Sequence, residues 1–244
     1  MFILKNLSAK VSGCQKFLLH NLSLSCDAGS VHAIMGPNGS GKSTFTHAIL
    51  GNPAYEIQAD ILSFHDSHVI DLPVHKRAQM GIFVSFQNPY VLPGMQVFRF
   101  LKETYTAFTG KAIELSVFTQ KLHKLLPLLG MQESFLTRNV NEGFSGGEKK
   151  RLEMLQLLLF QPKLVILDEI DSGLDIDGLK MVSQALVQFK KENSQAIIII
   201  ITHYSTILEY IHPDFVHILK NGTIVHSGDA SIVKTIQECG YDSF

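Results

Sequence analysis

Cysteines are few in this chain, and a long apolar run is absent. Its 244 residues include three cysteines, Cys14, Cys26 and Cys239, whose spacing fits neither a disulfide framework nor a zinc site. The amino terminus lacks a signal-peptide pattern, and no run approaches the roughly 18 consecutive apolar residues of a membrane-spanning helix. These absences predict a chain of a reducing compartment, the cytoplasm, that does not itself cross a membrane.

An excess of charge of either sign is also missing. Twenty-one basic residues face 22 acidic ones, so the charge balance gives no reason to expect nucleic acid or a membrane surface as a partner. Hydrophobic residues make up 45% of the chain and charged residues 18%, which is typical of a globular protein with a sizeable core. Without an internal repeat or a low-complexity linker, we expect one domain over residues 1–244.

A glycine-rich stretch matches the phosphate-binding loop G-x-x-x-x-G-K-[ST] at every fixed position. The apolar run before it, 31–35, predicts a buried strand, and residues 43–50 predict a helix, which is the setting that this loop requires. Its backbone N–H groups and the helix N-terminus attract phosphate. The residues expected to bind a nucleotide here are Gly36, Pro37, Asn38, Gly39, Ser40, Gly41, Lys42, Ser43 and Thr44.

Within this loop two side chains have separate expected roles. The Lys42 ammonium group is expected to reach the β- and γ-phosphates, and the Ser43 hydroxyl to ligate Mg²⁺. A second pair, Asp168 and Glu169, ends the apolar run 164–167, so both should emerge at the carboxyl edge of the sheet. Asp168 is placed to hold Mg²⁺ through water, and Glu169 to orient or deprotonate an attacking water.

Strand and helix patterns alternate along the chain, which predicts an α/β fold with a mostly parallel sheet. Together with the phosphate-binding loop, this pattern resembles a P-loop NTPase. Residues 2–11 and 17–25 predict an antiparallel β flap. Helical periodicity from residue 88 to about 141 predicts an inserted helical subdomain, 88–143, within a nucleotide-binding core of 1–87 and 144–244. Further strands are expected within 57–71 and at 81–86, 164–169, 196–202, 215–220 and 223–226, and helices at 74–80, 177–190 and from 143–147 to about 160.

Two further features concern the proposed site. Residues 144–148 begin a helix, which makes Ser145, Gly146 and Gly147 a second candidate anion site. The basic run 149–151 that follows favours a solvated helix face over a binding patch. His203 follows an apolar strand, so it should reach the same sheet edge as Asp168.

Taken in order, these motifs resemble the full motif set of the ATP-binding-cassette ATPases. The resemblance implies that Gln87 lies near Mg²⁺ and the attacking water, and that His203 contacts the γ-phosphate. It also implies that Asp175 belongs to the loop after the two carboxylates. The signature of one subunit, Ser145, Gly146, Gly147 and Glu148, would close on the phosphates held by another subunit, giving an ATP-dependent homodimer.

Two stretches, 141–151 and 167–177, resemble more specifically the SufC-type ATPases of the Suf iron–sulfur cluster assembly system. That resemblance implies SufB-like and SufD-like scaffold proteins as partners, with ATP and Mg²⁺ as cofactors. Glu148 departs from the general cassette pattern, because transporter ATPases usually carry glutamine there. Val11 also departs from it, at a place where many cassettes present an aromatic residue to the adenine.

The alternative interpretation is the nucleotide-binding subunit of a membrane transporter, coupled to a permease through the surface of 88–143. The sequence of the signature disfavours it, and with 41 residues after His203 we expect no appended regulatory domain. A non-catalytic, nucleotide-gated interaction module is disfavoured because Glu169 is present.

Overall fold

The computed structural model describes residues 1–86, 89–203 and 205–244. A six-stranded sheet lies at its centre, in the order β13, β12, β3, β11, β10, β7. Its neighbouring strands are parallel except for the β12–β13 hairpin, so the predicted α/β fold with a mostly parallel sheet is confirmed. The strands are β3 (Val31–Met35), β7 (Ile82–Ser85), β10 (Leu164–Asp168), β11 (Ile197–Ile201), β12 (Phe215–Lys220) and β13 (Thr223–Gly228).

The central strands are apolar throughout because both faces of this sheet are covered. In β11, a run of five isoleucines, Ile198 and Ile200 pack in one core with residues of the later helices. Ile197, Ile199 and Ile201 pack in a second core with the N-terminal strands. Successive side chains of a strand point to opposite faces, so this unbroken run supplies both cores at once.

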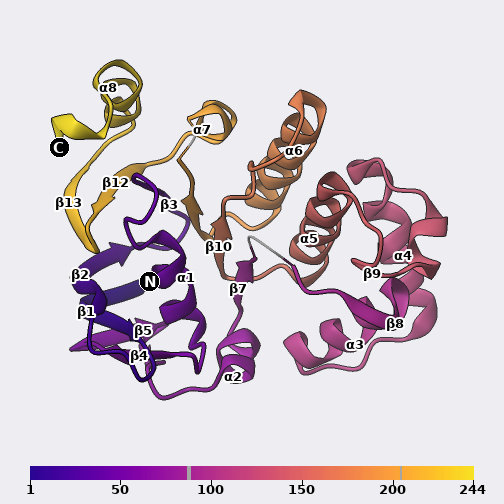
Figure 1. The fold of residues 1–244 in the computed structure, drawn as a ribbon. Helices are drawn as coiled ribbons and strands as arrows, with labels where there is room; N and C mark the ends of the chain where they lie inside the picture. The colour runs from indigo at the N-terminus through magenta and orange to yellow at the C-terminus, as the bar shows by residue number, and fades with distance from the viewer. Residues whose placement is uncertain (87–88, 204) are drawn as a thin grey trace.

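An antiparallel sheet covers one side of the central sheet (Figure 1). Strand β1 pairs with β2 from Phe2 opposite Cys26, and it also pairs with β4 and β5, which confirms the predicted flap. The strands are β1 (Phe2–Val11), β2 (Phe17–Cys26), β4 (Tyr55–Gln58), β5 (Ile61–Phe64) and β6 (Ser67–His68).

The helices between residues 89 and 143 lie on the other side of the central sheet from the flap (Figure 1). They are α3 (Val97–Thr109), α4 (Leu115–Leu125) and the 3-10 turns η1 (Pro127–Leu129) and η2 (Glu133–Thr137). The helical periodicity missed a short ribbon of β8 (Leu92–Gln96) with β9 (Asn139–Val140). Pro93 and Gly94 in β8 are residues that a strand rarely tolerates, so no local pattern indicates this pairing.

The remaining helices are α1 (Lys42–Leu50), α2 (Val74–Gln79), α5 (Gly146–Phe160), α6 (Ile176–Glu192), α7 (Thr206–Tyr210), α8 (Ser231–Cys239) and the 3-10 turn η3 (Tyr241–Ser243). Arg77 of α2 is 1% exposed and ties α2 to the end of α1. Its guanidinium donates hydrogen bonds to the backbone oxygens of Ala48, Ile49, Ile70 and Leu72 at 2.7 to 3.0 Å. In the described residues no helix combines the length and the apolar composition needed to span a bilayer.

Candidate active site

The predicted phosphate-binding loop joins β3 to α1 at the carboxyl end of the parallel strands, as expected. Gly41 caps α1 with a φ of 109°, a conformation that residues with a Cβ rarely adopt. At Gly36 a Cβ would collide with the backbone oxygen of Leu219 in β12. The two glycines therefore let the loop lie close to β12 and then turn directly into the helix.

Lys42 lies inside the curve of this loop. Its Nζ donates hydrogen bonds to the backbone oxygens of Gly36 at 2.9 Å and Pro37 at 3.0 Å. Burial lowers the pKa of Lys42, and the nearby carboxylates of Glu169 and Asp168 oppose this shift. The ammonium group is thus held in the loop by neutral carbonyl oxygens, and the two carboxylates favour its charged form. A charged ammonium group in this position is suited to contact a phosphate.

A cavity of about 550 Å³ opens over the loop, within the range of small-molecule sites. Glu169 and His203 contribute to its wall together with residues of the loop. The structure therefore brings two of the predicted catalytic residues to the predicted phosphate site. Within the described residues the lining is Leu18, Asn38, Gly39, Gly41, Lys42, Ser43, Thr44, Glu169 and His203.

The two acidic residues after β10 differ in their surroundings. Asp168 is 4% exposed, and burial raises its pKa to about 6, partly offset by a hydrogen bond from Thr46. Glu169 has a φ of 50°, and its Oε1 lies 3.3 Å from Nδ1 of His203. Of these two residues only Glu169 lines the cavity. The two carboxylates therefore occupy different positions, as their different expected roles require.

The residues at this edge fit a magnesium ion. Ser43 and Asp168 offer the oxygen ligands that this cation prefers. The Oδ1 atom of Asp168 is buried, and within the described residues it has no hydrogen-bond partner, so a bound cation would satisfy it. The third predicted ligand, Gln87, which is also a predicted catalytic residue, lies outside the described residues.

The signature residues form the start of α5. Ser145 caps the helix: its Oγ accepts from the N–H of Glu148 at 3.2 Å, and Glu148 Oε2 accepts from the N–H of Ser145 at 2.8 Å. Glu148 also pairs with Arg138, whose guanidinium lies 4.3 Å from the centre of the Phe144 ring. Arg138 was not predicted, because it lies before the signature in the chain and no sequence pattern marks it.

The signature does not line the cavity of its own chain, and neither does Asp175. Asp175 instead caps α6, where its Oδ1 accepts from the N–H of Gly178 at 2.7 Å. Apart from its chain neighbours and the backbone of α5 itself, a Cβ at Gly146 or Gly147 would meet no described atom within 4 Å, so the surface above the start of α5 is open.

The prediction of a solvated face at 149–151 is wrong for Lys150, which is 6% exposed. Its Nζ lies 3.4 Å from Oε2 of Glu153, a residue that is 5% exposed. The other Glu153 oxygen accepts from the N–H of Phe86 at 2.8 Å. Helix α5 is enclosed by its neighbours on most sides, so this charged pair lies in the interior.

Comparisons with known proteins identify the family of this chain. A profile of the ABC transporter family matches residues 19–172. A probable ATP-dependent transporter, ycf16, of Pyropia yezoensis is 48% identical over 245 residues, covering 98% of this chain and 95% of the relative. A probable ABC transporter ATP-binding protein of Streptococcus pyogenes is 44% identical over 240 residues, covering 98% of this chain and 92% of the relative.

Solved structures that resemble this chain include ATP-binding cassettes. A dimeric ATP-binding cassette in a post-hydrolysis state, bound to ADP and phosphate, aligns with a TM-score of 0.78 at 20% identity. The alignment covers 94% of this chain and 98% of that one. The chain therefore belongs to the ABC transporter family, as an ATP-hydrolysing cassette that uses ATP and Mg²⁺.

Proposed function

We propose that this ATPase is a subunit of an iron–sulfur cluster assembly complex, and that ATP-dependent pairing of two copies changes the conformation of SufB-like and SufD-like scaffold proteins. The observation that carries this proposal is the resemblance of 141–151 and 167–177 to the SufC type. Lys150 and Asp171 of these stretches are almost fully buried, and both belong near the acidic pair, because the charge of Lys150 acts on Asp168 and Asp171 follows Glu169 by two residues. Both stretches therefore contribute side chains to the interior beside the site.

The residues of the cavity have the following proposed roles. The nucleotide-binding core is 1–87 with 144–244, and its loop binds the phosphates of ATP. Ser43, Asp168 and Gln87 hold Mg²⁺, which would supply positive charge to the phosphate oxygens. Glu169 orients the attacking water, and His203 contacts the γ-phosphate.

A second copy of the chain completes the site in this proposal. The signature and Asp175 lie outside the cavity of their own subunit, and the surface above Gly146 and Gly147 is open. A two-fold pair in which each α5 N-terminus faces the loop of the other copy would place these residues on both nucleotides. The resolved relative in a post-hydrolysis state is itself a dimer.

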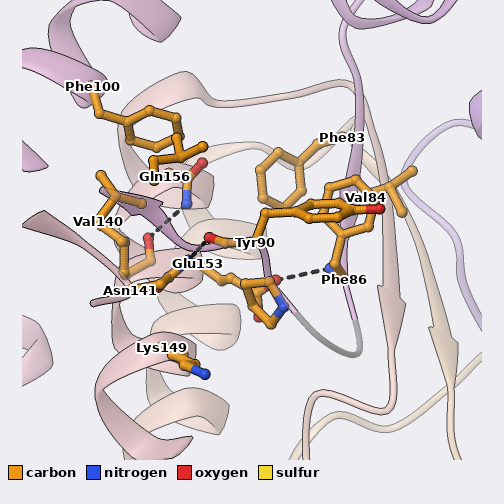
Figure 2. A pocket seen from close by; sticks show the side chains of 13 residues that line it. Phe83, Val84, Phe86, Tyr90, Phe100, Val140, Asn141, Lys149, Glu153 and Gln156 are labelled. Carbon is orange, nitrogen blue, oxygen red and sulfur yellow. Dashed lines mark hydrogen bonds between the residues drawn. The ribbon is translucent and has the colours of Figure 1, made fainter. Parts of the chain in front are cut away.

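An apolar groove offers a surface for the scaffold. A cavity of about 310 Å³ lies between β7 and α5, with Phe83, Val84 and Tyr90 in its wall (Figure 2). A neighbouring apolar cavity of about 300 Å³ shares Phe83 and Val84, so the apolar surface is continuous. We propose that an apolar helix of the scaffold binds here, beside the helical subdomain 88–143.

The ion pair of Glu153 and Lys150 relates the groove to Asp168 through charge. Glu153 lines it and accepts the hydrogen bond from Phe86, as Figure 2 shows. The same carboxylate contacts Lys150, whose charge in turn acts on Asp168. A scaffold helix that moved Glu153 in the groove would therefore change the charge around Asp168, a proposed magnesium ligand.

The second candidate function is the nucleotide-binding subunit of a membrane transporter. The names of the relatives favour it, because both describe a probable transporter component. In that case the groove would receive a segment of a membrane-spanning protein.

Affinity purification of the tagged chain from its native cell separates the two functions. We expect the tagged chain to be recovered without detergent together with two scaffold proteins. Recovery only with a multispanning protein in detergent would support the transporter, and a chain recovered alone would contradict both.

Tyr90→Glu, at a residue 75% exposed on the groove, should reduce recovery of the partners. Leu115→Glu, at a residue 57% exposed outside the groove, is the matched control.

A further inference from the structure

The loops that follow β10 and β11 are joined by a buried hydrogen bond. The Oγ1 atom of Thr202 donates to Oδ2 of Asp171 at 2.7 Å. Thr202 is 0% exposed and Asp171 is 9% exposed. Thr202 directly precedes His203, and Asp171 follows Glu169 by two residues. This bond therefore links the two loops that contribute Glu169 and His203 to the cavity wall.

The backbone of the Glu169 loop needs support. Glu169 has a φ of 50°, a left-handed conformation that is uncommon for a residue with a side chain. Its N–H donates to the backbone oxygen of Ile201 at 2.9 Å, and its own oxygen accepts from Ser172 at 3.1 Å. Asp171 lies within the tight turn that the second bond closes, so its side chain can fix the turn against β11.

A buried carboxylate is costly unless hydrogen bonds compensate for the lost water. The Oδ1 atom of Asp171 is buried without a hydrogen-bond partner in the described part of the chain, and burial raises the pKa of Asp171. Such a residue weakens the fold compared with an apolar one of similar size. Its presence beside the catalytic loops therefore points to a role in the reaction.

We propose that Asp171 is a positioning residue, whose hydrogen bond with Thr202 holds the Glu169 turn in place against the His203 loop. The bond keeps Oε1 of Glu169 and Nδ1 of His203 at their separation of 3.3 Å. This inference rests on the catalytic roles proposed above for Glu169 and His203.

Steady-state hydrolysis by three variants tests the bond. Thr202→Val keeps the shape of the side chain but removes the donor, and we expect kcat to fall about tenfold or more with the KM for ATP within about twofold of wild type. Thr202→Ser keeps the hydroxyl and should retain most of the activity. Asp171→Asn keeps an acceptor oxygen and should be less impaired than Asp171→Ala.

A double-mutant cycle measures the link itself. If Asp171 acts through Thr202, the variant with both Asp171→Ala and Thr202→Val should be no slower than the worse single variant. Additive losses, or a wild-type kcat in folded Thr202→Val, would overturn the inference. Glu169→Gln in the same assay separates this failure from that of the proposed function, because an active Glu169→Gln variant contradicts the role of Glu169 itself.

Discussion

The Nδ1 atom of His203 lies 3.3 Å from Oε1 of Glu169, across the loops that end β11 and β10. Both side chains line the cavity that also contains Lys42. A carboxylate that orients water must be next to the terminal phosphate, and an imidazole beside it can donate a hydrogen bond to that phosphate. This contact therefore marks the point in the cavity where we expect hydrolysis to take place.

Glu169→Gln should bind ATP as well as wild type and hydrolyse it about a hundredfold or more slowly, because the amide cannot accept a proton from water. Steady-state phosphate release measures the hydrolysis rate, and equilibrium titration with ATP measures the affinity. A variant whose turnover stays within twofold of wild type would show that another group activates the water.

The buried Asp168 should make stability depend on pH in the nucleotide-free protein. Its pKa rises from 3.8 to about 6 on folding, so between these values the folded chain keeps a proton that the unfolded chain has lost. The free energy of unfolding should therefore fall as pH rises through this window. Above about pH 6 the cost of the buried charge is fully present.

Asp168→Asn removes that cost. In denaturant unfolding at pH 7.5 the variant should be more stable than wild type by about 1–3 kcal/mol, and the difference should disappear below about pH 4. Asp66→Asn, at an exposed turn, is the matched control and should leave the free energy of unfolding almost unchanged. A constant difference at all pH values would mean that the effect of Asp168→Asn comes from packing and not from charge.

Arg77 should be important for the stability of the loop–helix unit. Arg77→Met leaves backbone oxygens at the end of α1 without their buried donor, so we expect a loss of about 2–4 kcal/mol in the free energy of unfolding. Lys76→Met, at the exposed neighbouring residue, should change stability by less than about 0.5 kcal/mol. Equal midpoints for the two variants would contradict this account of how α2 is attached.

The sequence predicted the parts of the site that depend on local patterns. A glycine-rich loop between an apolar strand and a helix, and the acidic pair Asp168 and Glu169 after another strand, show their positions within a few residues. Lys150 and Glu153 could not be predicted as buried, because a lysine and a glutamate three residues apart are usually a surface pair on a helix. Their burial depends on how the neighbouring helices enclose α5.

Long-range pairings were also outside the reach of the sequence. The Thr202–Asp171 hydrogen bond joins residues 31 apart in the chain, and the Leu92–Val140 pairing of β8 with β9 joins more distant ones. Neither has a repeating pattern that would indicate its partner. The predicted site therefore contained the motif residues and lacked the side chains that hold them in place.

In the proposed dimer each active site is built from two copies of the chain, with the phosphate loop from one and the signature from the other. Two variants each disable one of these two parts of the site. Lys42→Ala weakens phosphate binding by removing a charge from the loop, and Ser145→Arg places bulk and positive charge at the start of α5. Each variant alone should be nearly inactive at any protein concentration.

The most direct test is the hydrolysis rate of an equal mixture of these two variants at micromolar concentration. A mixed pair has one site with both changes and one site with neither, so the mixture should recover about a quarter of the wild-type specific activity when copies pair at random. If every site is complete within one chain, mixing cannot restore an intact site. A mixture no more active than its separate components, or a fully active Ser145→Arg variant, would contradict the two-copy site.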